Sequence, residues 1–234
     1  MNTRLVGSEM CIRDSTICFA RRFATYKRAP LVFRDTNRLA AILNNPEQPV
    51  QLIFAGKAHP RDTDGQAFAQ KIFKLSRRPE FRGKVVVLDE YDMRVGRELT
   101  SGADVWLNTP IRPHEASGTS GMKPPMHLGV NCSILDGWWP EGFDGKNGFA
   151  IVGTPSRSGA TARDQADAEA LYAVLEEELI PEFFSRNRKG LPTRWMKRAL
   201  RSAATVPGAF STHRMVGDYV DQAYLPAHRN QPAR

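Results

Sequence analysis

Short apolar runs alternate along the chain with longer stretches in which apolar side chains recur at helical spacing. Runs of strand length occupy residues 17–20, 50–55, 85–88, 103–107 and 132–135. Helical patterns lie between them, over residues 26–43, 66–75 and 95–99. This alternation predicts right-handed strand–helix–strand units, and therefore an α/β fold with a Rossmann-like parallel sheet. Ligands of such sheets bind beyond the carboxyl ends of the strands.

The second half of the chain changes character after the fifth predicted strand. Residues 137–163 are rich in Gly, Pro, Ser and Asp, and we predict a loop there. Helical spacing returns over residues 165–184, 193–203 and 211–224. The pattern thus divides the chain into an α/β domain (16–163), C-terminal helices that complete it (164–225) and a flexible tail (226–234).

Residues 1–15 show neither helical nor strand periodicity. Their run V-G-S-E-M-C-I-R-D-S resembles a translated sequencing-adapter read-through, and it has too little charge or apolar length for a signal peptide. We interpret the segment as a non-native artefact, with a genuine disordered N-terminus as the alternative. On this interpretation the chain is a fragment of a protein that continues upstream.

Composition excludes several classes of function. The net charge of +8 is scattered among acidic residues, which does not favour a nucleic-acid partner. No apolar run approaches the roughly 20 residues of a membrane helix, so we expect no membrane partner. Cys11, Cys18 and Cys132 lack metal-ligand spacing, as do the histidines, so we predict no metal site. Buried free thiols in a reducing cytoplasm are the simplest interpretation.

The run E-A-S-G-T-S-G-M-K over residues 115–123 carries the main candidate chemistry. Backbone amides of such a small-residue turn can point at an anion, and a lysine beside bound phosphate and other cations can form a Schiff base. From spacing alone, an ordinary helix-start loop with a surface lysine remains the alternative. Pro124 and Pro125 suit a first helical turn, which places the expected helix start near Met122.

This run is very similar to the cofactor-lysine motif of the α-glucan phosphorylases, the glycogen, starch and maltodextrin enzymes. The flanks agree: D-V-W-L-N-T-P over residues 104–110, and S-I-L-D-G-W-W over residues 133–139. The second flank is typical of the short prokaryotic class. The resemblance covers about residues 17–227 and implies the C-terminal domain of a GT-B type two-domain glycosyltransferase fold.

The resemblance also implies a cofactor and its ligands. Lys123 would carry pyridoxal 5'-phosphate. The residues matched to the cofactor phosphate within the motif are Thr119, Ser120 and Gly121. The residues matched to the sugar and the substrate phosphate are Glu115, Ser117 and Gly118.

The basic segment R-R-F-A-T-Y-K-R, residues 21–28, is by itself most simply a solvated helix start. Arginine grips phosphate with paired donors, whereas lysine supplies a compact charge. By resemblance, Arg22 matches the arginine on inorganic phosphate and Lys27 the lysine near the cofactor phosphate, which makes them catalytic with Lys123. Tyr91 matches a tyrosine whose hydroxyl approaches that phosphate; a half-buried packing tyrosine is the alternative.

Three further features have plainer explanations. Gly56-Lys57-Ala58 resembles a family segment at the site, or is an ordinary strand-to-helix turn. Trp138-Trp139 could form a sugar-stacking platform, although we favour packing. The acidic run at residues 176–178 is best explained as a solvated helix face.

The implied reaction is reversible phosphorolysis of an α-1,4-glucan by inorganic phosphate, which releases glucose 1-phosphate. In this family the cofactor's phosphate exchanges a proton with inorganic phosphate. We expect the chain alone to be inactive without its upstream domain, and a homodimer is possible. The alternatives are a nucleotide-sugar glycosyltransferase of the same fold without pyridoxal phosphate, and a basic anion-binding module.

Overall fold

The computed structural model describes residues 14–155 and 158–229. These residues form one six-stranded sheet with the order β3-β2-β1-β4-β5-β6, and every neighbouring pair is parallel. The strands are β1 Ser15–Ala20, β2 Val50–Ala55, β3 Val85–Leu88, β4 Val105–Asn108, β5 Val130–Ile134 and β6 Gly148–Ile151. The predicted Rossmann-like α/β fold is confirmed, and the strand order reverses direction between β1 and β4.

The predicted loop over residues 137–163 is wrong in part. It contains the short helix α5 (Trp139–Gly142) and the sixth strand, β6, which pairs along β5 from Asn131 to Ile134. A four-residue strand between polar turns has no period of its own to detect. It is held by its pairing with β5, and by Phe149, whose ring stacks on Trp195 of a later helix at 6.4 Å between centroids.

The predicted helix over residues 26–43 is also broken. The structure has two 3-10 turns, Thr25–Lys27 and Ala29–Phe33, before helix α2 (Thr36–Leu43). Arg28 between the turns adopts a left-handed conformation (φ 45°), and Pro30 lacks an amide donor, so a continuous helix cannot form. Asp35 caps the N-terminus of helix α2, and its carboxylate accepts a hydrogen bond from the Arg38 amide at 2.9 Å.

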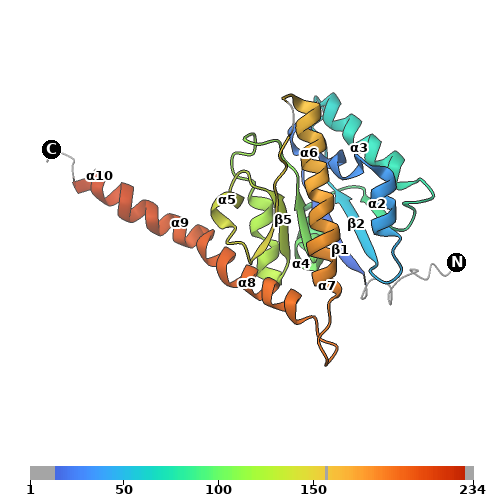
Figure 1. The fold of residues 1–234 in the computed structure, drawn as a ribbon. Helices are drawn as coiled ribbons and strands as arrows, with labels where there is room; N and C mark the ends of the chain where they lie inside the picture. The colour runs from blue at the N-terminus through green and yellow to red at the C-terminus, as the bar shows by residue number, and fades with distance from the viewer. Residues whose placement is uncertain (1–13, 156–157, 230–234) are drawn as a thin grey trace.

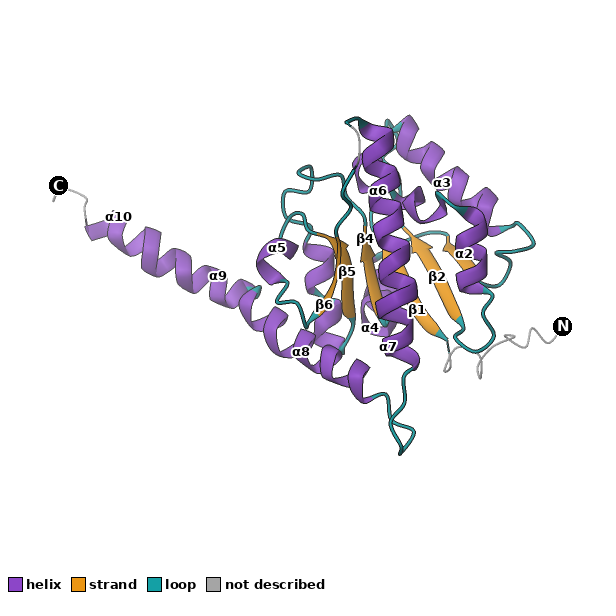
Figure 2. Ribbon diagram, in the orientation of Figure 1, coloured by secondary structure: helices purple, strands orange, loops and turns teal. Residues whose placement is uncertain are grey.

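The strands bury both faces of the sheet, as expected when helices cover each side (Figure 2). On β1, Ile17 and Phe19 join the large core against helices that include α2 and α6. Cys18 and Ala20 alternate with them and join a smaller cluster on the other face, where Trp106 is buried. The free thiols of Cys18 and Cys132 are both buried, as predicted.

The remaining helices follow the strands in sequence, and their bounds can be given together. They are α3 Thr63–Ser76, α4 Met93–Gly102, α6 Ala160–Ala173, α7 Ile180–Phe184, α8 Thr193–Ala209, α9 Thr212–Tyr219 and α10 Leu225–Arg229. π-helical turns at Val174–Leu179 and Val220–Tyr224 join α6 to α7 and α9 to α10. Helices α9 and α10 form an arm that extends away from the sheet (Figure 1).

The two ends of the chain differ from the predicted segmentation. Ser15, assigned to the artefact segment, opens β1 and pairs with Val50, while residues 1–13 lie outside the described part. At the other end, α10 carries the helix to Arg229, so the first four residues of the expected tail are helical. Residues 230–234 are outside the described part.

Candidate active site

The candidate site lies at the carboxyl edge of the sheet, where the strand order reverses between β1 and β4. The segment after β1 carries Arg21 and Lys27, and the segment after β4 leads to Glu115. The Thr109 hydroxyl donates to the carbonyl oxygen of Lys27 at 3.1 Å and so ties the two segments together. This position is the usual ligand crevice of an open parallel sheet.

Arg28 anchors the segment that follows β1. Its guanidinium is buried and donates to the carbonyl oxygens of Thr109 (3.0 Å) and Pro110 (2.7 Å). It also forms ion pairs at 2.7 Å with Asp164 and Asp167 of α6. All these partners come from the protein itself, so Arg28 is structural.

Glu115 holds two buried cations. Its Oε2 accepts from Arg21 at 2.6 Å and from Lys27 at 2.9 Å, while Oε1 lies 3.1 Å from the Lys27 amine. The three side chains are only 6%, 9% and 9% exposed, in the order Arg21, Lys27, Glu115. The cluster therefore concentrates one excess positive charge in a poorly solvated place.

Sequence reasoning chose Arg22 and missed Arg21. In the structure Arg22 is exposed and forms no hydrogen bond or ion pair with the described residues, whereas Arg21 is buried against Glu115. The Nε atom of Arg21 is buried without an acceptor in the same part of the chain. Arg22 thus remains available to an incoming anion, while Arg21 orients Glu115.

The motif loop, residues 115–123, turns at Gly118, which is left-handed (φ 78°). A 3-10 turn follows over Thr119–Met122, and a second over Pro124–His127. The α-helix expected near Met122 does not form there; Pro124 and Pro125 both open the second 3-10 turn. Within the described residues, the amides of Ser117 and Thr119 have no acceptor, and a left-handed residue followed by a helical turn is a backbone arrangement that binds anions.

Side chains of strands β4 and β5 contact this loop. Trp106 and Asn131 are register partners on the two strands. The Trp106 indole lies 3.4 Å from the Ser120 hydroxyl, and the Asn131 amide donates to the Gly121 carbonyl at 2.8 Å. A Cβ atom on Gly121 would come within 2.5 Å of the Asn131 side-chain oxygen, so a glycine is required there.

A cavity of about 590 Å³ opens beside the loop and helix α4. Its lining includes Tyr91, Trp106, Ser120 and Lys123. Burial raises the pKa of Tyr91, and the neighbouring Cys18 raises it further, so the phenol keeps its proton. A Cβ atom on Gly96 of α4 would lie 2.8 Å from the Tyr91 hydroxyl, so the glycine makes room for it.

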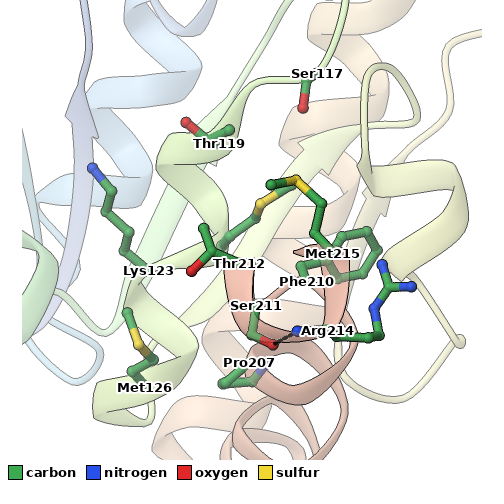
Figure 3. Close-up of a pocket in the computed structure, with 11 residues that line it drawn as sticks. Ser117, Thr119, Lys123, Met126, Pro207, Phe210, Ser211, Thr212, Arg214 and Met215 are labelled. Atoms are coloured by element: carbon green, nitrogen blue, oxygen red, sulfur yellow. Dashed lines mark hydrogen bonds between the residues drawn. The ribbon is translucent and has the colours of Figure 1, made fainter. Parts of the chain in front are cut away.

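A second cavity of about 520 Å³ lies between the loop and the start of the helical arm (Figure 3). Ser117, Thr119 and Lys123 line one side of it, and Phe210 and Met215 line the other. The exposed Lys123 side chain extends away from Phe210 and Met215 (Figure 3). Lys123 therefore borders both cavities.

The structure divides the predicted site residues into three groups, and Arg22 belongs to none of them. Tyr91, Ser120 and Lys123 line the first cavity, and Lys27 pairs with Glu115. The residues that join Lys123 at the second cavity are Ser117 and Thr119. The two motif glycines, Gly118 and Gly121, shape the backbone and line neither cavity.

The tryptophan pair serves packing, as we favoured. Trp138 and Trp139 are buried, and the Trp138 ring meets the ring of Phe210 at 4.9 Å between centroids. The described residues contain no group of three or more side chains able to hold a metal ion. Nor does the described part of the chain include a helix long and apolar enough to cross a membrane.

Comparison with protein-family models finds no match. The maltodextrin phosphorylase of Thermococcus litoralis is 49% identical over 215 residues, which are 92% of this chain and 25% of that protein. The glycogen phosphorylase of Aquifex aeolicus is 44% identical over 209 residues, 89% of this chain and 30% of that protein. The matches fall on the C-terminal part of these relatives, so the chain spans between a quarter and a third of their length.

Solved structures share the fold. The C-terminal domain of a glycosyl transferase group 1 family protein (LpcC) from Francisella tularensis aligns with a TM-score of 0.56 at 15% identity, over 85% of this chain and 87% of that one. Anabaena Alr3699/HepE, in complex with UDP and glucose, aligns with a TM-score of 0.59 at 15% identity, over 90% and 49%. The fold is that of a GT-B C-terminal domain, and by sequence the chain is a homologue of the C-terminal part of the maltodextrin and glycogen phosphorylases.

Proposed function

We propose that the chain is the cofactor-carrying part of an α-glucan phosphorylase, which catalyses reversible phosphorolysis of α-1,4-glucans to glucose 1-phosphate with pyridoxal 5'-phosphate. One observation carries the proposal. Lys123 borders a cavity with Tyr91 and Ser120, in a chain whose named relatives are phosphorylases. The buried free thiols support a cytoplasmic location.

The residues present fit this cofactor. A cavity of about 590 Å³ lies in the size range of small-molecule sites. Lys123 offers the amine that would hold the aldehyde, and Tyr91 offers a phenol that stays protonated. The turn at Gly118 offers a phosphate the amides of Ser117 and Thr119, two residues that line the second cavity and whose amides have no acceptor among the described residues. When bound, the cofactor would supply a phosphate group able to exchange a proton with inorganic phosphate.

The chain's own charges would stabilise two phosphates in one cleft. Two unit charges of the same sign about 4 Å apart repel by about 4 kcal/mol at an effective dielectric constant of about 20. The cluster of Arg21, Lys27 and Glu115 supplies one fixed positive charge, and Arg22 adds a second that no described residue neutralises. Because Glu115 holds Arg21 and Lys27 before any ligand binds, little reorganisation is needed.

The glucan would approach from the exposed side of the motif loop. Ser117 and Thr119 are exposed there, beside Gly118. The named relatives are about three to four times longer than the matched region, and we assign the remaining glucan contacts to the part that this chain does not cover. We therefore expect the chain alone to bind the cofactor without catalysing phosphorolysis.

Pyridoxal phosphate uptake separates this proposal from its alternatives. The wild-type chain should develop cofactor absorbance, and borohydride reduction should convert the attachment to a permanent secondary amine that a peptide mass places on Lys123. Lys123→Arg keeps the charge and should abolish the attachment, whereas Lys71→Arg, at an exposed site on α3, should leave it unchanged.

The two alternatives make different predictions in the same assay. A nucleotide-sugar glycosyltransferase would take up no pyridoxal phosphate and would bind a nucleoside diphosphate instead. A basic anion-binding module would lose its cofactor signal steeply with salt and would keep it in Lys123→Arg. Either outcome would overturn the proposal.

A further inference from the structure

The motif loop is held at a second place, by the turn that follows β5. The Asp136 carboxylate accepts a hydrogen bond from the Glu115 amide at 2.9 Å. Two residues later, the Trp138 amide donates to the Ser117 carbonyl at 2.9 Å. We name the turn Asp136–Gly137–Trp138 the β5 turn. It is hydrogen-bonded to the loop at two places, Glu115 and Ser117.

Gly137 allows this close approach. It adopts a left-handed conformation (φ 60°), and a Cβ atom there would lie 2.3 Å from the Ser117 carbonyl oxygen. An ordinary contact begins at 3.4 Å, so the carbonyl would have to move by about 1 Å. The carbonyl precedes Gly118, so this shift would alter the turn whose amides face the proposed phosphate.

The Trp138 ring also contacts the loop, near Gly121. It is buried, and a Cβ atom on Gly121 would meet it at 3.2 Å. The Trp138 ring also packs edge-to-face against Phe210, the residue after α8. The side-chain amide of Asn131, on β5, donates a hydrogen bond to the Gly121 carbonyl oxygen. Loop atoms at Glu115, Ser117 and Gly121 are thereby fixed by β5 and its turn.

We infer that the β5 turn and Asn131 are a positioning device for the motif loop, so that Gly137, Trp138 and Asn131 are positioning residues for the cofactor site. The inference rests on the proposed function for its ligand. It requires that the loop adopt its conformation only when residue 137 is small enough for the Ser117 carbonyl oxygen to accept the hydrogen bond from the Trp138 amide. None of the three residues lines either cavity, so each acts through the loop.

Gly137→Ala tests the device, and Gly145→Ala is its matched control. Both glycines are left-handed (φ 60° and 82°), so both substitutions strain the backbone. A Cβ atom on Gly145 meets no atom within 4 Å, whereas one on Gly137 meets the loop. We expect hydrogen exchange of the hydrogen-bonded amides that hold the loop, those of Glu115, Trp138 and Lys123, to accelerate about tenfold or more in Gly137→Ala and to stay unchanged in Gly145→Ala.

The cofactor gives a second measurement. The dissociation constant of pyridoxal phosphate should rise about tenfold in Gly137→Ala, with a changed absorbance spectrum, and should be unaltered in Gly145→Ala. A second pair of variants, a test and its control, serves if Gly137→Ala fails to fold. Asn131→Ala removes a buried amide donating to the Gly121 carbonyl, and Asn147→Ala removes one donating to the Gly142 carbonyl at 2.7 Å. Asn131→Ala alone should loosen the loop.

The outcomes separate the two ideas. If both members of each pair accelerate loop exchange equally, the effect is general destabilisation and the positioning inference is wrong. If Gly137→Ala or Asn131→Ala loosens the loop selectively while the wild-type chain takes up no pyridoxal phosphate, the β5 turn and Asn131 still position the loop and the proposed function is wrong. Selective loosening with unchanged cofactor affinity and spectrum would refute the positioning role.

Discussion

Replacing Glu115 by glutamine is expected to destabilise the chain strongly, because Arg21 and Lys27 then share a buried place without a carboxylate. Glutamine has one oxygen that can accept a hydrogen bond, and its amide group would face a cation. The guanidinium and ammonium groups now lie 2.6 Å and 2.9 Å from the same carboxylate oxygen. The substitution would leave two positive charges close together with little water to screen them.

The structure sets the size of the effect. All three side chains are less than a tenth exposed, so solvent screening is weak. Removing one partner of a buried ion pair costs about 3–5 kcal/mol, and we take about 3 kcal/mol because the glutamine oxygen keeps one hydrogen bond. For a domain of this size each 1 kcal/mol lowers the melting temperature by roughly 2–4 °C, which gives roughly 6–12 °C.

Urea and thermal unfolding would measure this, with Glu98→Gln as the control. Glu98 pairs with Arg94 at 3.2 Å, but the two side chains are 62% and 79% exposed, so its loss should cost less than about 0.5 kcal/mol. Inorganic phosphate should restore part of the stability of Glu115→Gln, since an anion can replace the carboxylate between the cations. A loss no larger than that of Glu98→Gln would refute the reasoning.

Two further predictions concern buried groups away from this cluster. Burial raises the pKa of Asp104, although its hydrogen bond from the Thr16 amide lowers it in part. A raised folded-state pKa means that ionised Asp104 penalises the folded state at neutral pH, and that the penalty disappears as pH falls through that pKa. Asp104→Asn should therefore increase the free energy of unfolding at pH 7, with the gain shrinking towards about pH 4; a gain independent of pH would contradict this. Burial also raises the pKa of the Cys18 thiol to about 12 and raises that of Cys132, so peptide mapping after alkylation at pH 8 should find both unmodified until the chain is unfolded.

The amino-acid sequence by itself determined the class of fold and the identity of the cofactor lysine candidate. Five of the six strands in the described part are evident as apolar runs, since a buried parallel strand must be apolar on both faces. The motif ending at Lys123 is also a local feature, and so is its similarity to a family. The sequence did not reveal β6, because Gly148–Ile151 is stabilised by its neighbour β5 rather than by any pattern of its own.

Only the tertiary structure decided which residues lie together at the candidate site. Arg21 and Arg22 are adjacent and identical, and the structure separates them because Arg21 alone meets Glu115, 94 positions away. The broken helix before α2 has the same kind of cause, since Arg28 is bound to carbonyl oxygens 81 and 82 positions away. Periodicity records how a residue relates to its near neighbours. Pairing of buried charges and close backbone approaches, such as Gly137 against Ser117, depend on contacts that exist only once the sheet has formed.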